Sequence, residues 1–431
     1  MIERVYLANL SQHLDQTVSV VGFVRVFRDQ GKIKFVQLYD RTGSVQLVIL
    51  PQHSQAFSQS QQLHLESVIQ VKGLVKKAPQ APQGFEIEVT DLTILSAADP
   101  ELPIPVIPEK GADKTDVSKC FNWRWLDLRQ PQKQRIFQVW TVLEKGVRAA
   151  LLENDFLQIY SPSLMNTASE SGAEVFEVKY FESTAYLAQS PQFYKQMAMS
   201  AGLERVFLVG PVYRAEPSFT TRHMTEFTGW DFEMSYIDSH HDVMDMEEKI
   251  LISGFKQLKQ ELQLDIEIPT SPFPRISLLE VKQKLAKIGV TSDKPDDLSP
   301  LEERELADLV KKETGSDFVF VIDYPISVRP FYHMRHPDNP QLTKSFDLLY
   351  KGLEITTGAQ REHRYSVLVD QAKEKGMALE PLTNYLNFFR YGCPPHGGVG
   401  IGPARIIMKL LDLPSVKEAT FLPRDVRRLT P

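Results

Sequence analysis

Short apolar runs separated by polar turns fill the first hundred residues of the chain. The runs are rich in Val, Ile, Leu and Phe, and they cover residues 18–27, 34–38, 44–50, 67–75 and 85–95. Asp40-Arg41-Thr42-Gly43 joins the second run to the third and is typical of a β-hairpin turn. The pattern therefore predicts five short strands, which is the strand content of a small closed barrel.

The OB-fold is the leading candidate for this barrel because it is five-stranded and binds oligonucleotides on one face. Residues 1–100 contain equal numbers of basic and acidic side chains. A barrel without net charge that carries Phe, Gln and Arg suits stacking on bases and reading their edges better than bulk attraction of phosphate. We therefore expect residues 1–100 to form an OB-fold domain that binds nucleic acid.

Proline-rich sequence follows the predicted barrel, with prolines at positions 100, 103, 105 and 108. Proline fixes φ and removes a backbone donor, which interrupts strand pairing. We therefore place a linker at residues 101–123. The remainder, residues 124–431, is expected to form a larger domain.

Helical and β-rich patterns alternate in this larger domain. Apolar residues recur at helical spacing over residues 133–153. Ser239 with Asp242 predicts a capping box at the start of an amphipathic helix that reaches residue 262. β-rich runs cover residues 205–213, 227–236, 318–322, 345–349 and 399–401. Several of these runs can pair as antiparallel strands, so we expect an α+β domain rather than a doubly wound sheet.

Composition and charge narrow the class of protein. The chain has 431 residues, of which 42% are apolar and 24% charged, and its formal net charge is −6. These values exclude a disordered chain and a global positive field, so nucleic acid must be bound by local patches. No segment reaches the roughly 18 apolar residues of a membrane span, and the first residues lack the apolar core of a secretory signal. The two cysteines, Cys120 and Cys393, offer no disulfide framework, so we expect a cytoplasmic protein without membrane contact.

A glycine cluster at residues 397–402 runs from a predicted strand into a predicted helix. It falls short of a dinucleotide fingerprint, and the chain has no phosphate loop of the G-x-x-x-x-G-K-[ST] type. One interpretation is tight packing of the strand against the helix. The other is close approach of the backbone to a nucleotide, with Arg405 in the first turn of the helix facing phosphate.

A second cluster gathers two arginines, a histidine and several acids within residues 213–234. If strands bracket a loop here, arginine can hold phosphate and Phe227 can stack on a base. The alternative is a salt-bridged sheet surface. A third segment, residues 352–361, combines Glu354 and hydroxyls suited to Mg²⁺ with Arg361, which suits a carboxylate. Taken alone, it also fits a polar strand end and turn.

Two histidine pairs stand outside these segments. His240 and His241 lie close to Asp238 along the chain, and we interpret this polar group as the cap of a helix rather than a metal site. The spaced pair His333 and His336 receives the same interpretation. The sequence thus predicts a metal ion only at the third segment.

Several blocks follow one another in a fixed order. The predicted barrel is followed by Arg124-Trp125-Leu126-Asp127-Leu128-Arg129, by Ser161-Pro162, by the cluster around Arg214 and by Gly400-Ile401-Gly402-Pro403-Ala404-Arg405. This order resembles a class II aminoacyl-tRNA synthetase across nearly the whole chain. Gln189-Ser190-Pro191-Gln192-Phe193-Tyr194-Lys195-Gln196 and the ending Leu422–Pro431 are similar to the aspartyl enzymes of the archaeal and eukaryotic type. The resemblance implies a catalytic domain at residues 124–431, built on an antiparallel sheet flanked by helices.

The resemblance also implies a reaction and its partners. L-Aspartate attacks the α-phosphate of ATP, and tRNA(Asp) then takes the aspartyl group from the adenylate. Mg²⁺ accompanies ATP, and the chain forms a homodimer. The protein needs little covalent chemistry of its own, because positioning of the substrates and neutralisation of charge account for the rate.

Matching positions imply roles for individual residues. The implied catalytic residues are Arg214, which bridges the α-phosphate and the attacking carboxylate, Arg405, which grips the far phosphates, and Glu354, which binds Mg²⁺ with Thr357. The implied ATP-binding residues are Arg214, Ala215, Glu216, Arg222, His223, Met224, Phe227, Glu354, Gly402, Pro403, Ala404 and Arg405. The implied aspartate-binding residues are Glu170, Gln192, Lys195, Arg214, Thr357 and Arg361.

Lys195 and Arg361 are expected to bracket the side-chain carboxylate of aspartate. Two fixed cations attract a carboxylate but leave a neutral amide among unpaired charges, so asparagine is rejected. The related asparaginyl enzymes lack the lysine of the Gln-Ser-Pro-Gln block and the Arg-Leu-Thr-Pro ending that this chain has. Aspartate is therefore the expected substrate, and an asparaginyl-tRNA synthetase is the alternative.

In the barrel, Phe35 matches the family's anticodon-stacking aromatic residue, and Gln46 and Glu86 match positions that read anticodon edges. Discriminating archaeal-type enzymes carry a lysine near the turn where this chain has Pro82. Arg25 stands where an aromatic residue or histidine is more usual. The resulting hypothesis is relaxed tRNA choice, in which tRNA(Asn) is also charged with aspartate.

The third signature of the family usually reads Gly-Leu-Glu-Arg or Gly-Ala-Glu-Arg, where this chain has Gly402-Pro403-Ala404-Arg405. The arginine is kept and the acid beside it is lost. Because proline is tolerated in the first turn of a helix, we expect ATP binding to persist. Two alternatives remain: a weakened paralogue that retains RNA binding, and a tRNA-free asparagine synthetase, whose relatives lack the barrel.

Overall fold

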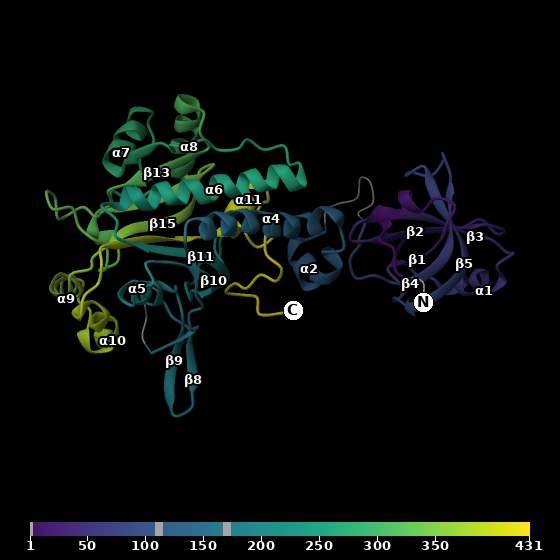
Figure 1. The fold of residues 1–431 in the computed structure, drawn as a ribbon, viewed down its shortest axis with the longest axis horizontal. Helices are drawn as coiled ribbons and strands as arrows, with labels where there is room; N and C mark the ends of the chain where they lie inside the picture. The colour runs from purple at the N-terminus through teal and green to yellow at the C-terminus, as the bar shows by residue number, and fades with distance from the viewer. Residues whose placement is uncertain (1–2, 108–114, 167–173) are drawn as a thin grey trace. The chain divides into compact units, whose positions relative to one another are not determined.

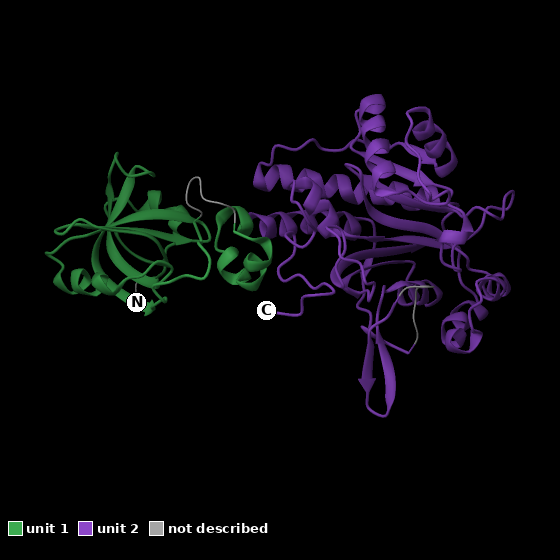
Figure 2. Cartoon of the chain, turned by 180° about the vertical axis from the view of Figure 1, so that it is seen from behind, with its two compact units in different colours: residues 1–134 green, residues 135–431 purple. Residues whose placement is uncertain are grey.

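The computed structural model describes residues 3–107, 115–166 and 174–431 (Figure 1). The chain divides into two compact units, residues 1–134 and residues 135–431, which Figure 2 shows in different colours. The first unit contains both the predicted barrel and the predicted linker. Among the helices of the described ranges, none combines the length and apolar character that crossing a membrane requires.

The strands of the first unit close into a barrel in the order β1-β2-β3-β5-β4. They are β1 (Thr17–Asp29), β2 (Lys34–Asp40), β3 (Gly43–Ile49), β4 (Val68–Lys77) and β5 (Phe85–Ser96). Neighbours are antiparallel except β3 and β5, which are parallel. Alternate side chains, among them Val20, Val36, Leu47 and Ile87, are fully buried inside the barrel. The predicted five-stranded barrel is confirmed.

The turn between β2 and β3 shows how a short polar sequence forms a hairpin. The carboxylate of Asp40 accepts hydrogen bonds from the backbone N–H groups of Thr42, at 2.7 Å, and Gly43, at 3.2 Å. An aspartate that bonds the backbone two residues on stabilises a turn. The predicted hairpin turn is therefore confirmed.

Short helices complete the first unit. They are η1 (Leu7–His13), α1 (Ser54–Gln59), η2 (Ser60–Gln62), α2 (Val117–Asn122) and α3 (Arg124–Asp127). Helix α2 lies within the predicted linker, where Asp116 caps it by accepting a hydrogen bond from the backbone N–H of Lys119 at 3.0 Å. The prolines of this region gave no indication of that helix.

An eight-stranded sheet forms the centre of the second unit, in the order β12-β13-β14-β15-β16-β11-β10-β6. The strands are β6 (Leu157–Gln158), β10 (Arg205–Tyr213), β11 (Glu226–Ser235), β12 (Arg275–Ser277), β13 (Phe318–Ile322), β14 (Ser345–Tyr350), β15 (Leu353–Arg361) and β16 (His396–Ile401). The pairs at its two edges, β12 with β13 and β10 with β6, are parallel, and the central pairs are antiparallel. A small separate sheet has the order β7-β9-β8, with β7 (Leu164–Met165), β8 (Glu177–Tyr180) and β9 (Ser183–Leu187). The predicted α+β class is confirmed.

The remaining helices lie beside the large sheet or pack against a neighbouring helix (Figure 1). They are α4 (Pro131–Glu153), α5 (Gln192–Ser200), α6 (His240–Leu262), α7 (Leu278–Lys287), α8 (Pro300–Thr314), η3 (Ile326–Val328), α9 (Tyr365–Glu374), α10 (Leu379–Arg390) and α11 (Pro403–Leu410). The predicted capping box of α6 is present. The hydroxyl of Ser239 accepts from the N–H of His241 at 3.1 Å, and the carboxylate of Asp242 accepts from the N–H of Ser239 at 2.9 Å.

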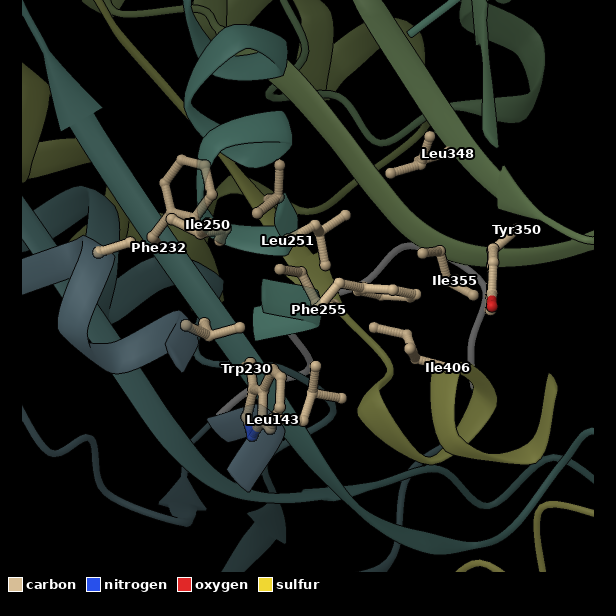
Figure 3. Packing of buried hydrophobic residues seen from close by; sticks show 14 of the residues in the cluster. Leu143, Trp230, Phe232, Ile250, Leu251, Phe255, Leu348, Tyr350, Ile355 and Ile406 are labelled. Atoms are coloured by element: carbon tan, nitrogen blue, oxygen red, sulfur yellow. The ribbon is translucent and has the colours of Figure 1, made fainter. Parts of the chain in front are cut away.

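The main hydrophobic core lies between the large sheet and helices α4, α6 and α11 (Figure 3). Leu143 of α4, Ile250 of α6 and Ile406 of α11 contribute to it, together with strand residues. Gly146 of α4 and Gly254 of α6 let the two helices approach closely, because a Cβ at Gly146 would lie 2.7 Å from the carbonyl oxygen of residue 253. The helix pair therefore packs backbone to backbone at this point.

Candidate active site

A cavity of 320 Å³ opens among β10, β11, β15, β16, α5 and α11. This volume is within the usual range of small-molecule sites. Most of the predicted ATP and aspartate residues line it: Gln192, Lys195, Arg214, Glu216, Arg222, His223, Met224, Phe227, Glu354, Thr357, Arg361, Gly402, Ala404 and Arg405. The fold thus brings together side chains from the widely separated sequence blocks.

Three of the predicted ATP and aspartate residues are not among the residues that line the cavity. Ala215 lies in the loop after β10, and its N–H donates to the carbonyl oxygen of Glu174 at 3.1 Å. Pro403 is the first residue of α11, a position where a missing N–H costs no intrahelical bond. Glu170 lies outside the described residues.

The two faces of β11 have different chemistry because its side chains alternate. Trp230 and Phe232 point into the hydrophobic core, so Asp231 and Glu233 lie on the opposite face. The neighbouring strand β16 carries glycine there. A Cβ at Gly398 would lie 2.2 Å from Oε2 of Glu233. The glycine cluster thus makes room for buried acids, a role that neither interpretation of its sequence included.

Lys195 and Arg361 meet at the carboxylate of Glu233. Nε of Arg361 donates to Oε1 of Glu233 at 3.0 Å, and Nζ of Lys195 lies 3.4 Å from Oε2. Lys195 also donates to Oδ2 of Asp231 at 2.8 Å. Each of these four charged side chains is at least nine-tenths buried. Two acids of the 213–234 cluster thus form ion pairs, but with Lys195 and Arg361 from other segments, and these pairs are buried beside the cavity rather than on a sheet surface.

Charge balance in this group depends on Glu233. Burial raises the pKa of Glu233, but the charges of Arg361 and Lys195 outweigh burial and hold the pKa below its usual value. Burial and the charge of Arg361 lower the pKa of His333 well below its usual value, so this imidazole is neutral and its Nε2 accepts from Nη1 of Arg361 at 3.1 Å. The two carboxylates of this group therefore balance the charges of Lys195 and Arg361, and the neutral His333 contributes no charge.

Glu354 and Thr357 share one face of β15 because the strand contains a bulge. Leu348 of β14 pairs with Thr356, whereas the next residue, Leu349, pairs with Glu354, which leaves Ile355 as an extra residue. Residues three apart in a regular strand would point to opposite faces. With the bulge, Oγ1 of Thr357 lies 3.5 Å from Oε1 of Glu354. No pattern along the chain indicated this bulge.

Arginines surround Glu354. Nη1 of Arg405 donates to the backbone oxygen of Glu354 at 2.8 Å and to its Oε1 at 3.2 Å. Arg222 is held at 2.6 Å by both oxygens of Glu303, a residue of α8 that sequence reasoning missed because it lies 81 positions away. The guanidinium of Arg214 lies 5.6 Å from the centre of the Phe227 ring. This end of the cavity is therefore rich in fixed positive charge.

The residues around Glu354 suit a divalent cation of the Mg²⁺ type. Burial raises the pKa of Glu354, but Arg405, Arg329, Arg222 and Arg214 outweigh it and lower the pKa below its usual value. The carboxylate is therefore ionised. An ionised carboxylate next to a hydroxyl is the hard oxygen donor set that Mg²⁺ prefers.

A separate groove of 70 Å³ lies on the barrel. Its lining includes Phe35, Gln46 and Pro82, three residues that the sequence assigned to tRNA. Nε2 of Gln46 donates to Oε2 of Glu86 at 2.9 Å, so these two predicted base readers lie side by side. Arg25 is not part of this group.

The side chain of Arg25 is buried within the first unit. Its Nε lies 3.0 Å from Oε1 of Glu66, its Nη2 donates to the backbone oxygen of Arg129 at 2.6 Å, and its guanidinium covers the ring of Tyr39. Burial lowers its pKa despite the charge of Glu66. The structure therefore does not bring Arg25 to the groove that contains Phe35.

The chain matches two protein families. Residues 116–426 match the family described as tRNA synthetases class II (D, K and N). Residues 18–95 match the family described as OB-fold nucleic acid binding domain. Together, these matches span both compact units.

Curated relatives and solved structures are similar over nearly the whole length. The aspartate–tRNA(Asp/Asn) ligase of Aeropyrum pernix is 42% identical over 96% of this chain and 95% of its own. The aspartate–tRNA(Asp) ligase of Pyrococcus abyssi is 38% identical over 100% of both chains. The asparaginyl-tRNA synthetase of Pyrococcus horikoshii, complexed with asparaginyl-adenylate, has a TM-score of 0.91 at 32% identity over 100% of both chains. The aspartyl-tRNA synthetase of Entamoeba histolytica has a TM-score of 0.88 at 30% identity, covering 100% of this chain and 93% of its own.

Proposed function

This chain belongs to the class II tRNA synthetases of the D, K and N group, and we propose that it joins L-aspartate to tRNA(Asp) in a reaction driven by ATP. The membership confirms the predicted resemblance, and the curated relatives named above are aspartate ligases at 38% and 42% identity. The solved structures do not separate the two, since the asparaginyl structure is 32% identical and the aspartyl structure 30%, so the curated relatives decide between them. The asparaginyl alternative is therefore not favoured.

Lys195 and Arg361 both contact the carboxylate of Glu233, and this arrangement is the observation that supports aspartate as the substrate. Both cations line the cavity and are fixed by buried partners. A substrate carboxylate at this end gains charge-assisted hydrogen bonds, which are worth about 1.5–3 kcal/mol each. The NH₂ group of asparagine would instead face the N–H donors of Lys195 and Arg361, to which a donor cannot form a hydrogen bond.

Two displacements complete the reaction. In the first, an α-carboxylate oxygen of aspartate bonds to the α-phosphorus of ATP, and the bond from that phosphorus to the bridging oxygen breaks, so pyrophosphate leaves. Arg214 neutralises charge that develops between the carboxylate and the α-phosphate, Arg405 and Arg222 hold the far phosphates, and Phe227 stacks on adenine. In the second, the terminal ribose hydroxyl oxygen of tRNA bonds to the aspartyl carbonyl carbon, the bond from that carbon to the phosphate oxygen of the adenylate breaks, and the hydroxyl proton passes to the leaving AMP.

We also propose that Glu354 and Thr357 hold Mg²⁺ together with ATP. The ionised carboxylate of Glu354 and the hydroxyl 3.5 Å away supply hard oxygen atoms on one face of β15. When bound, Mg²⁺ neutralises phosphate charge and orients the leaving group. The bulge at Ile355 keeps both side chains on the same face.

The barrel is proposed to bind the anticodon. In this assignment, residues 1–100 form the anticodon-binding domain, residues 101–123 connect it, and residues 124–431 form the catalytic domain. Phe35 stacks on a base, and the paired side chains of Gln46 and Glu86 read base edges. Because Pro82 replaces the lysine of discriminating enzymes, tRNA(Asn) is also charged. The buried Arg25 acts on tRNA choice only through the packing of the barrel.

A homodimer in the cytoplasm is the proposed setting. Strand β6 is an edge of the large sheet, and Leu157 and nearby Tyr160 are 52% and 81% exposed, which suits burial against a second copy. Cys120 and Cys393 are unpaired, which is typical of a reducing compartment.

Aspartate-dependent exchange of pyrophosphate into ATP, followed by charging of tRNA(Asp) and tRNA(Asn) transcripts, tests this function. We expect exchange with aspartate and not with asparagine, and aspartylation of both transcripts. Exchange with asparagine alone would identify an asparaginyl enzyme. Absence of exchange with retained tRNA binding would identify the weakened paralogue, and charging of tRNA(Asp) alone would reject relaxed choice.

A further inference from the structure

Three metal-ligating side chains converge outside the cavity, where the beginning of α6 meets the end of β13. The ligand atoms of His240, Asp323 and His336 all lie within 4.8 Å of one another. Nε2 of His336 is 2.8 Å from Oδ1 of Asp323, and Nε2 of His240 is 3.9 Å from the same oxygen. We propose that this His240–Asp323–His336 cluster binds a divalent transition-metal ion of the Zn²⁺ type.

The ring of His240 is the strongest reason for this assignment. The side chain is buried, with 3% exposure, and neither ring nitrogen has a hydrogen-bond partner among the described residues. Buried polar atoms without partners are uncommon and unfavourable. A metal ion bound to Nε2 would give this nitrogen the partner that no described side chain provides.

Fixed cations lie near the cluster. Burial lowers the pKa of His240, and the charges of the neighbouring histidines, Lys344 and Arg275 add to this effect. Because Arg275 and Lys344 disfavour any added cation, the carboxylate of Asp323 is the essential counter-charge.

The separations are close to those of a bound site. Zn²⁺ with nitrogen and oxygen ligands at about 2.0–2.1 Å in a tetrahedron places those ligands about 3.4 Å apart. Nε2 of His240 is 3.9 Å from Oδ1 of Asp323 and all three ligand atoms lie within 4.8 Å of one another, so His240 must approach its partners by up to about 1.4 Å. The hydrogen bond from His336 to Asp323 opens when the metal enters between them. Both of these residues are about one-quarter exposed, which provides entry from solvent and room for water as the fourth ligand.

The cluster is chemically distinct from the Glu354–Thr357 pair. Imidazole ligands favour Zn²⁺, Co²⁺ and Ni²⁺, whereas Mg²⁺ selects oxygen ligands. A metal here would join α6 to the segment after β13, which carries His333 and Arg329 towards the cavity. Metal binding at the cluster is therefore expected to stabilise this region and not to take part in the reaction.

Titration of the full-length protein with Co²⁺ in excess Mg²⁺, followed by visible absorption, tests the site. We expect one high-affinity Co²⁺ per chain, displaced by Zn²⁺. Asp323→Asn keeps the left-handed backbone of Asp323 (φ 63°), which Asn tolerates, and removes the charge. We expect Asp323→Asn and His336→Ala each to weaken binding at least about tenfold, as loss of a supporting residue already does in other metal sites.

His64→Ala serves as the matched control, because it removes an exposed imidazole of the barrel. It is expected to bind Co²⁺ like the wild type. Zn²⁺ should also raise the Tm of the wild type and of His64→Ala but not that of Asp323→Asn. Equal Co²⁺ affinity and equal Zn²⁺ stabilisation in wild type and Asp323→Asn would overturn the proposal and leave the proposed aminoacylation untouched.

Discussion

Arg361 donates a hydrogen bond from its Nε to Oε1 of Glu233 at 3.0 Å, across 128 positions of the chain. The other oxygen of the same carboxylate lies 3.4 Å from Nζ of Lys195. Because Glu233 is fully buried, it fixes where both cations stand before any substrate arrives. Their desolvation is thus already offset by protein carboxylates, and an incoming carboxylate meets a preorganised pair.

Replacing Lys195 by Gln should raise the KM for aspartate in pyrophosphate exchange by roughly 10–150-fold, because one charge-assisted hydrogen bond of about 1.5–3 kcal/mol is lost. Lys256→Gln, on the exposed side of α6, is the matched control and should leave this KM unchanged. The KM for ATP should stay near its wild-type value in both variants. An aspartate KM within twofold of wild type in Lys195→Gln would contradict the assigned pocket.

Arg405→Gln should affect the nucleotide instead. Its guanidinium donates to the backbone and carboxylate of Glu354, and it lines the cavity. We expect the KM for ATP to rise roughly tenfold or more, with little change in the KM for aspartate, since a phosphate contact is lost. Arg390→Gln on the exposed face of α10 is the control. If the aspartate KM rises as much as the ATP KM, Arg405 is not specific to phosphate.

The strongly patterned elements could be predicted from sequence. The barrel strands, β10, β11, α4 and α6 follow runs of apolar residues at strand or helix spacing, and burial on one face explains why. The cavity residues were predicted through their resemblance to a family, and the fold brings most of them together. Helix α8 is more polar than α4 and α6, and no helix was predicted there.

The remaining features depend on contacts that a linear pattern does not contain. The bulge at Ile355 becomes visible only in the pairing of β14 with β15. Glu303 reaches Arg222 from another helix, and His240 joins His336 through Asp323 only once β13 is in place. The contacts of Arg222 with Glu303 and of His240 with Asp323 each join positions more than eighty residues apart, and the bulge depends on strand register, so spacing along the chain carries no information about them.

The pH dependence of stability should depend on Glu247, a fully buried residue of α6. Burial raises its pKa to about 8, and the charge of nearby Glu248 adds to this effect. Between the ordinary carboxyl pKa and pH 8, the folded state holds a proton that the unfolded state has lost, so the contribution of Glu247 to stability falls as pH rises. Urea unfolding at several pH values should show this.

Glu247→Gln removes the titrating group but keeps the shape. We expect a higher urea midpoint than wild type at pH 8 and a smaller difference at pH 5. Glu153→Gln, an exposed residue near the end of α4, should change the midpoint equally little at both values. A Glu247→Gln effect that is the same at pH 5 and pH 8 would show that Glu247 does not retain its proton.

Two glycines of β16 provide a paired test of the buried acids. A Cβ at Gly398 would lie 2.1 Å from the backbone oxygen of Phe232 and 2.2 Å from Oε2 of Glu233, whereas a Cβ at Gly400 would lie 3.3 Å from Oδ2 of Asp231. Gly398→Ala should therefore lower the Tm markedly, because overpacking against backbone costs about 1–3 kcal/mol or more. Gly400→Ala should lower it less. Equal Tm values for the two variants in a thermal unfolding experiment would refute this account.

Restoring a lysine at the barrel groove should narrow the choice of tRNA. Pro82 lies in the same groove as Phe35 and Gln46, so a lysine in its place brings a charged donor to the proposed anticodon site. A base that cannot accept a hydrogen bond from this lysine leaves the donor unpaired, which costs about 1–3 kcal/mol of binding free energy. We expect Pro82→Lys to reduce aspartylation of tRNA(Asn) at least about tenfold and to keep that of tRNA(Asp) within about twofold.

Gln61→Lys is the control, because it adds the same charge at an exposed position of the first unit. It should leave the aspartylation of both transcripts unchanged. A parallel fall for both transcripts in Pro82→Lys would show a general loss of binding, and position 82 would then have no part in distinguishing the two tRNAs.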